Sequence, residues 1–163
     1  MKTKLFNGLL LFSLFGVALG FFGILYEGLV YGPKLLDTSM ERMLVWKGFF
    51  SVINPLVFYI PWVWLGSIIL VILYFITPKL KTEIKNRLKW ASILQLISLA
   101  ITFYIVTQIN FKLCFSDIGK YADVIPAKAF LFNILSVFRV IVTAIGLTFL
   151  FKGYIQTQKE LTN

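Results

Sequence analysis

The chain has 163 residues, of which 59% are hydrophobic, 17% aromatic and 14% charged, and its mean hydropathy is +0.86. Soluble domains carry about 25% charged residues, so this composition excludes a soluble globular domain and indicates a membrane protein. The net charge is +9. The basic residues lie in short loops between apolar segments, which argues for a topology signal and against nucleic-acid binding.

The residue inventory also excludes several kinds of chemistry. The chain has no histidine, which excludes histidine-ligated haem or metal sites and Ser-His-Asp triads. Its one cysteine excludes an intrachain disulfide and paired-thiol redox chemistry. We therefore expect neither a metal nor a cofactor. At this length, residues 1–163 are expected to form a single domain.

Four apolar segments follow one another along the chain. Each approaches or exceeds the roughly 20 residues that an α-helix needs to cross about 30 Å of hydrocarbon. We predict membrane spans at about residues 5–31, 48–77, 90–111 and 127–151. The predicted fold class is all-α, an integral membrane four-helix bundle.

The segment before the second span carries a helix-start signal of its own. Residues 38–41 read Thr-Ser-Met-Glu, the pattern of a capping box with Thr38 as the N-cap. A helix that began there and continued to the end of the span would be too long for a simple crossing. Pro55 and Pro61 are expected to kink it, leaving residues 39–51 as a short helical extension at the outer surface.

Loop charges predict the orientation of the four spans. Most lysines and arginines outside the spans lie at the two termini and between the second and third spans. Cytoplasmic loops are enriched in these residues. We therefore predict a multi-pass protein of the cell (inner) membrane with both termini in the cytoplasm.

Three glycines and a glutamate share one face of the first span. Gly16, Gly20, Gly23 and Glu27 are separated by four, three and four residues, which places them close to one line on a helix. Small residues in such a line allow another helix to approach closely. The glycines are therefore predicted to be packing positions, either within the bundle, against a second copy of the chain or against another membrane protein.

Arg139 interrupts the fourth span and is its most informative residue. An arginine near the centre of a bilayer costs about 2.5–3.5 kcal/mol on insertion scales and requires a partner or a wet cavity. Glu27 is the best candidate, because long helical side chains slant toward the N-terminus of their helix and these two would approach each other. The expected ion pair has two interpretations: a device that fixes helix assembly, or the polar floor of a ligand cavity open to the outer leaflet.

Other polar and aromatic residues are candidates for the lining of such a cavity. The third and fourth spans carry polar stripes at helical spacing that should face each other or the first span: Ser92, Gln95, Ser98 and Thr102, then Asn133, Ser136, Arg139, Thr143 and Gly146. Besides Glu27 and Arg139, we nominate as ligand-binding residues Asn54, Asn110, Trp46 and Tyr59.

Several short motifs together resemble the small four-span membrane proteins grouped with anthrone oxygenases. They are Gly32-Pro33 with Leu35, Trp46 before the second span, Gln108-Ile109-Asn110 at the end of the third, and Arg139 in the fourth. The resemblance spans nearly the whole chain. It implies a lipophilic aromatic ligand near Asn110 and Arg139, and the activity named for the family is a cofactor-free oxidation of a polycyclic anthrone to a quinone. Family members often place a histidine near this arginine, where this chain has Ser136 and Phe138.

Three functions remain open from the sequence. The first is binding of a lipophilic small molecule or lipid between the helices, or a role as an accessory membrane subunit. The second is a cofactor-free oxygenase-like reaction on a lipophilic aromatic substrate, with Glu27 as base and Arg139 holding an anionic intermediate. The third is proton-coupled transport that uses Glu27. The expected partners are the bilayer, a lipophilic molecule and a second copy or other membrane protein, and not nucleic acid.

Overall fold

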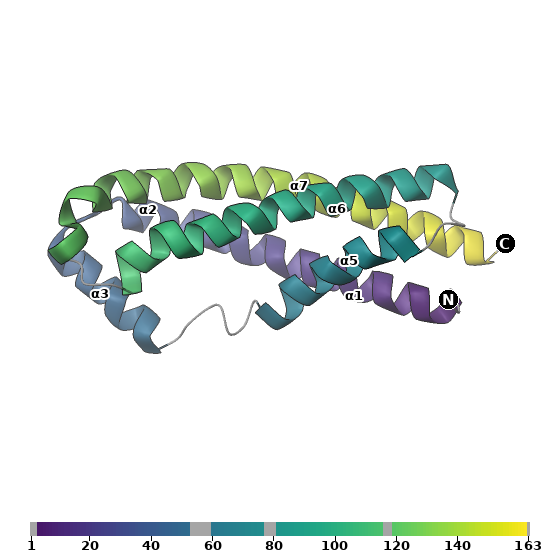
Figure 1. Ribbon diagram of the computed structural model, residues 1–163, viewed down its shortest axis with the longest axis horizontal. Coiled ribbons are helices and arrows are strands. Elements are labelled where there is room, and N and C mark those ends of the chain that lie inside the picture. Colours follow the sequence, from purple (N-terminus) through teal and green to yellow (C-terminus); the bar gives the residue numbers. More distant parts are fainter. Residues whose placement is uncertain (1–2, 53–59, 77–80, 116–118, 163) are drawn as a thin grey trace.

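The computed structural model describes residues 3–52, 60–76, 81–115 and 119–162, and all regular secondary structure in these ranges is helical (Figure 1). The α-helices are α1 Thr3–Tyr26, α2 Gly32–Leu35, α3 Met40–Val52, α5 Leu65–Ile76, α6 Thr82–Tyr104 and α7 Ile125–Thr162. Three π-helical segments, η1 Glu27–Tyr31, η2 Ile60–Trp64 and η3 Ile105–Phe115, and the 3₁₀ helix η4 Gly119–Val124 complete the described elements. The predicted all-α fold class is confirmed.

Four helices form an antiparallel bundle. In Figure 1, α1 and α6 run away from the end that holds both termini, and α5 and α7 run back toward it. α1 packs against α5 and α7, and α6 packs against the same two helices. At the opposite end of the bundle, α3 packs against η3, and η4 packs against α7.

Within the described residues, three continuous helical stretches are long and apolar enough to cross a membrane, namely Lys4–Leu35, Thr82–Leu113 and Gly119–Glu160. They contain the first, third and fourth predicted spans, and this chain is a membrane protein. The second predicted span, 48–77, corresponds to the end of α3 and a shorter apolar helix, Pro61–Ile76. Pro61 lies in η2, whereas Pro55 lies outside the described residues.

The helical extension before the second span is present as α3, but its start differs from the prediction. α3 begins at Met40, and the backbone N–H of Met43 donates to the carbonyl of Ser39 over 3.0 Å. The backbone N–H of Ser39 donates to Oδ1 of Asp37 over 3.2 Å. The prediction of Thr38 as the N-cap is therefore wrong by one residue. Ser39, whose carbonyl accepts the first hydrogen bond of the helix, occupies the N-cap position, and the Asp37 carboxylate forms a turn directly before it.

The core of the bundle has three layers along its axis. An apolar cluster at the end with the termini contains Phe6, Leu10, Leu70, Leu73, Ile84, Leu88 and Leu150. A second apolar cluster, at the α3 end, contains Leu35, Met43, Ile105, Ile109, Leu113, Ile125, Ala129 and Phe132. Between them lies what we call the polar layer: Ser67, Ser92, Gln95, Ser98, Thr102, Ser136, Arg139 and Thr143. All of its members except the half-buried Thr102 are buried.

Glycines bring α1 and α5 into close contact. A Cβ atom added at Gly16 would lie 2.5 Å from the carbonyl oxygen of Trp62 and 3.2 Å from Cα of Gly66. A Cβ atom at Gly20 would lie 2.9 Å from a methyl group of Val63. The absence of a side chain thus lets the two backbones approach at Gly16 and leaves room for the Val63 side chain at Gly20. Gly23 is also buried in α1.

Gly16→Ala should therefore destabilise the bundle, since its new methyl group would meet backbone atoms that cannot turn aside. We expect a loss of about 1–3 kcal/mol, the usual cost of overpacking. Gly8→Ala is the matched control on the same helix, where the added Cβ has no neighbour within 4 Å. Thermal unfolding in detergent should show a Tm below that of the wild type for Gly16→Ala. Gly8→Ala should show no such decrease. Equal Tm values for the two variants would contradict the close approach.

Candidate functional site: a buried ion pair and an aromatic cavity

The predicted ion pair between Glu27 and Arg139 is present. Nη2 of Arg139 lies 2.7 Å from Oε2 of Glu27, and Nη1 donates to the Thr102 hydroxyl over 3.1 Å. The Arg139 side chain is 2% exposed and that of Glu27 is 24% exposed. A single guanidinium group therefore joins three membrane-embedded segments, η1, α6 and α7.

A second contact from α7 holds the same part of the chain. Nδ2 of Asn133 donates to the carbonyl of Gly32, directly after η1, over 2.9 Å. A Cβ at Gly32 would lie 2.5 Å from Oδ1 of Asn133, so a larger residue at this position would displace the Asn133 side chain. The Gly32 N–H in turn donates to the carbonyl of Glu27, five residues earlier, which is the π-helical spacing. η1 is thus held to α7 at both of its ends.

Hydrogen bonds continue from the ion pair through the polar layer. The Thr102 hydroxyl donates to the carbonyl of Ser98, and the hydroxyl groups of Ser98 and Thr143 lie 2.8 Å apart. Farther along the axis, Nε2 of Gln95 donates to the Ser67 hydroxyl over 3.0 Å. The two polar stripes predicted on the third and fourth spans therefore face each other, and α5 adds Ser67.

Some buried polar atoms of this layer have no hydrogen-bond partner among the described residues. They are Nε of Arg139, Oγ of Ser136, Oγ of Ser92 and Oε1 of Gln95. A buried polar group without a partner costs about 1–3 kcal/mol. They form two pairs of neighbours on one helix turn, Ser136 with Arg139 on α7 and Ser92 with Gln95 on α6. The polar layer therefore has two sites at which buried polar atoms lack a hydrogen-bond partner in the described structure.

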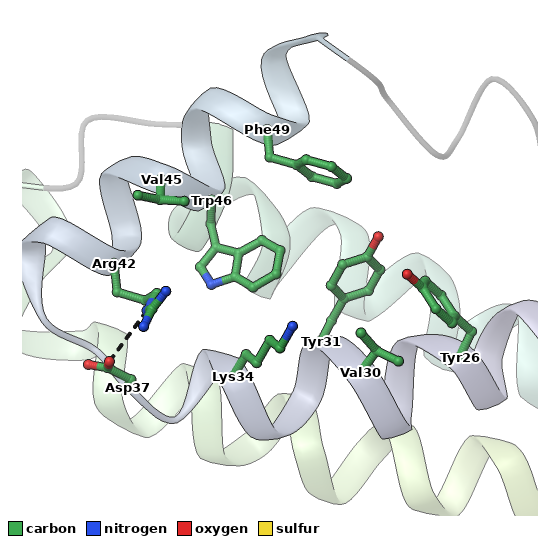
Figure 2. Close-up of a pocket in the computed structure, with 9 residues that line it drawn as sticks. All are labelled: Tyr26, Val30, Tyr31, Lys34, Asp37, Arg42, Val45, Trp46 and Phe49. Atoms are coloured by element: carbon green, nitrogen blue, oxygen red, sulfur yellow. Dashed lines mark hydrogen bonds and ion pairs between the residues drawn. The ribbon is translucent and has the colours of Figure 1, made fainter.

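A cavity of about 580 Å³ lies on the other side of η1, between η1 and α2 on one wall and α3 on the other (Figure 2). Its aromatic and aliphatic lining comes from Tyr26, Val30, Tyr31, Val45, Trp46 and Phe49. The rings contact one another: the Tyr31 ring is 5.3 Å from those of Tyr26 and Trp46. Such a lining suits the apolar part of a small molecule or lipid.

Three charged residues complete the lining at one end of the cavity. They are Lys34, Asp37 and Arg42. Nε of Arg42 lies 3.5 Å from Oδ2 of Asp37, and both side chains are half exposed. Nε1 of Trp46 is buried and has no hydrogen-bond partner among the described residues. The cavity therefore combines an aromatic wall with a few polar groups.

Asp37 is held in its charged form by its neighbours. Hydrogen bonds from Ser39 are the main cause that lowers the pKa of the Asp37 carboxyl, with a smaller contribution from Arg42. Because the folded-state pKa is lowered, the stabilisation is present above the ordinary aspartate pKa and is lost as the pH falls through the lowered value. The connection between α2 and α3 is therefore firmest when Asp37 is ionised.

The nominated ligand-binding residues are distributed over several places. Trp46 lines the cavity. Glu27 belongs to η1, as do Val30 and Tyr31 of the cavity wall, but it binds Arg139 on α7. Asn110 is half-buried in η3 and makes no hydrogen bond with the ion pair in the described structure. Asn54 and Tyr59 lie outside the described residues.

Sequence reasoning did not nominate Lys34, Asp37, Arg42 or Phe49 as site residues. A signal for them was available, since aromatic and basic residues recur on the two short segments that flank the helix-start signal at residues 38–41. A short turn brings consecutive helices side by side. Among the described residues, His, Cys, Asp and Glu side chains form no group of three or more that could hold a metal ion.

Comparisons with known proteins give no match: no family model, no curated protein and no solved structure is significantly similar to this chain.

The ion pair should show strong coupling between its partners. Glu27→Met leaves the guanidinium group of Arg139 buried without a counter-charge, and we expect a loss of about 3–5 kcal/mol. The double variant with Arg139→Met removes both charges and should recover much of this loss. Unfolding titrations in mixed micelles measure both values. Losses that simply add in the double variant would contradict the pairing.

The contributions of Ser39 and Arg42 to the lowered pKa of Asp37 can be separated by substitution. Ser39→Ala removes the leading hydrogen bond and should raise the pKa of Asp37 toward its ordinary value, whereas Arg42→Gln should raise it less. A carbon-detected NMR titration of the Asp37 carboxyl group measures both shifts. A larger effect of Arg42→Gln would show that charge, and not the turn at Ser39, controls this group.

Proposed function

We propose that this membrane protein binds an amphipathic, lipophilic molecule in the cavity between η1, α2 and α3. The observation that carries the proposal is an aromatic cavity of about 580 Å³ with polar groups gathered at one end. This size falls in the range of about 300–1,000 Å³ found for ligand sites. The aromatic rings supply apolar contact area and the few polar groups orient the ligand.

We further propose four membrane passes in the cell (inner) membrane, with both termini in the cytoplasm. Three long apolar helices and the shorter helix Pro61–Ile76 support four passes, and an even number of passes fits termini at the same end of the bundle (Figure 1). The concentration of basic residues at that end supports its cytoplasmic side. In this orientation, the cavity opens at the outer leaflet.

In this proposal the ion pair has a supporting role. Arg139 and Asn133 hold η1 and the start of α2 against α7. η1 carries Val30 and Tyr31 on its cavity side. The contacts with α7 therefore fix one wall of the cavity, and the wall on α3 is fixed by the packing of α3 against η3.

The other functions rank below ligand binding. An oxygenase-like reaction and proton-coupled transport both require the Glu27 carboxylate to exchange a proton, and its Oε2 is engaged by Arg139 at 2.7 Å. A role as an accessory subunit needs a partner surface, and Gly16 and Gly20 are already packed against η2 and α5 of the same chain. No observation of comparable weight favours these functions.

Filling the cavity should displace its ligand. Val45→Trp adds a large ring to the lining, and we expect about tenfold weaker retention of the bound molecule, a change of about 1.4 kcal/mol. Val52→Trp is the matched control, because Val52 is 82% exposed on the same helix and outside the cavity lining. Native mass spectrometry of detergent-purified protein, with extraction of small molecules, measures the retained species. Equal retention by both variants, or none by the wild type, would contradict the proposal.

A further inference from the structure

We propose that the cavity recognises a membrane phospholipid whose headgroup carries a net negative charge, by its phosphate. This inference rests on the proposed ligand site and names the chemical class of its ligand. Three independent features of the cavity carry it: the balance of charge in its lining, an unsatisfied donor beside that charge, and the order of polar and apolar groups along its length.

The lining carries one unbalanced positive charge. Asp37 is already engaged by Arg42 and by the backbone N–H of Ser39. Lys34 makes no salt bridge with any described residue, and its side chain is exposed. Two cations and one anion therefore line the same end of the cavity. A monoanionic group, such as the phosphate of a lipid, would balance this charge.

The indole N–H of Trp46 adds a donor at the same end. In Figure 2, the indole nitrogen lies on the side of the ring that faces the guanidinium group of Arg42, and the Lys34 side chain ends below the same ring. This nitrogen is covered and has no partner in the described structure. Lys34 and Arg42 are long, exposed side chains that can turn aside, so a phosphate or ester oxygen that entered between them would satisfy the donor.

Polar and apolar groups are ordered along the cavity as they are in a lipid. The charged residues gather at one end, and Tyr26, Tyr31 and Phe49 lie toward the other (Figure 2). Lys34 is the penultimate residue of the apolar stretch Lys4–Leu35, whereas Tyr26 lies about 12 Å deeper along the helix at 1.5 Å per residue. A lipid at its natural depth would therefore place its headgroup among the cations and its acyl chains against the rings.

The same arrangement disfavours zwitterionic lipids. A choline or ethanolamine group carries its own cation, which would lie near Lys34 and Arg42. Repulsion between these positive charges would weaken the binding of the lipid. An anionic lipid, such as phosphatidylglycerol, presents the phosphate without this competing charge. The preference should depend on Lys34, because Arg42 is already paired with Asp37.

Tryptophan quenching by brominated lipids tests this inference directly. A variant with Trp62, Trp64 and Trp90 replaced by phenylalanine retains Trp46 as its single tryptophan, and circular dichroism checks its fold. In mixed vesicles of brominated phosphatidylglycerol and phosphatidylcholine, with bromine on one lipid at a time, we expect about fivefold preference for phosphatidylglycerol at Trp46, as one basic residue near a membrane provides. Lys34→Gln should abolish the preference.

Lys47→Gln is the matched control, since Lys47 lies on the same helix, next to Trp46, and outside the cavity lining. It removes the same charge and should leave the preference unchanged. Equal quenching by both lipids, or a preference that survives Lys34→Gln, would contradict the recognition of an anionic headgroup. Either result would still be compatible with a binding site for a lipophilic molecule. No quenching of Trp46 by either lipid would remove the proposed ligand site as well.

A final arm separates lipid from free phosphate. Inorganic phosphate at millimolar concentration, added to the single-tryptophan variant in uncharged detergent, should not change Trp46 fluorescence or compete with phosphatidylglycerol. Competition by inorganic phosphate would show that the site takes a soluble anion, and would overturn the assignment to a lipid.

Discussion

The structure depends first on the burial of one arginine among membrane-embedded helices. A guanidinium group in this position is tolerated only when its charge and its donors are satisfied, and Arg139 meets this need with Glu27 from η1 and Thr102 from α6. The contacts that neutralise the charge therefore also fix the relative positions of three segments. Because these contacts join three segments, removing Glu27 is expected to disturb helix placement as well as the local contact, since it leaves an uncompensated charge in the core.

The π-helical segment η1 connects the buried ion pair to the cavity at the surface of the molecule. Its first residue, Glu27, binds Arg139, while Val30 and Tyr31 line the cavity beside α3. A π-helical turn changes which residues share a face, and such turns are common at functional sites. The buried ion pair and the cavity are thus opposite sides of one short element. In the proposed function, this connection gives the ion pair a supporting role, although Glu27 and Arg139 are not part of the cavity lining.

The layered core explains why the polar groups lie where they do. Apolar clusters close both ends of the bundle, and the polar layer lies between them. Serine, threonine and glutamine then bond across helices within the layer, each contact being worth about 0.6 kcal/mol. The cavity lies outside this core, at the α3 end, where charged side chains line one end of it. The proposed lipid ligand is consistent with this arrangement, in which the core is packed and the cavity outside it is lined by both aromatic and charged residues.

Composition and the periodicity of apolar residues were sufficient to predict an all-α membrane protein, since only helices of this length satisfy their backbone in lipid. They also predicted the pairing of Glu27 with Arg139, because a buried charge limits its own partners. The cavity was not predictable in the same way. Its walls depend on the register of η1, on the turn at Asp37 that precedes α3, and on the contact of Asn133 with Gly32, which holds the end of η1 against α7. These outcomes are decided by packing between helices, which periodicity along one helix does not determine.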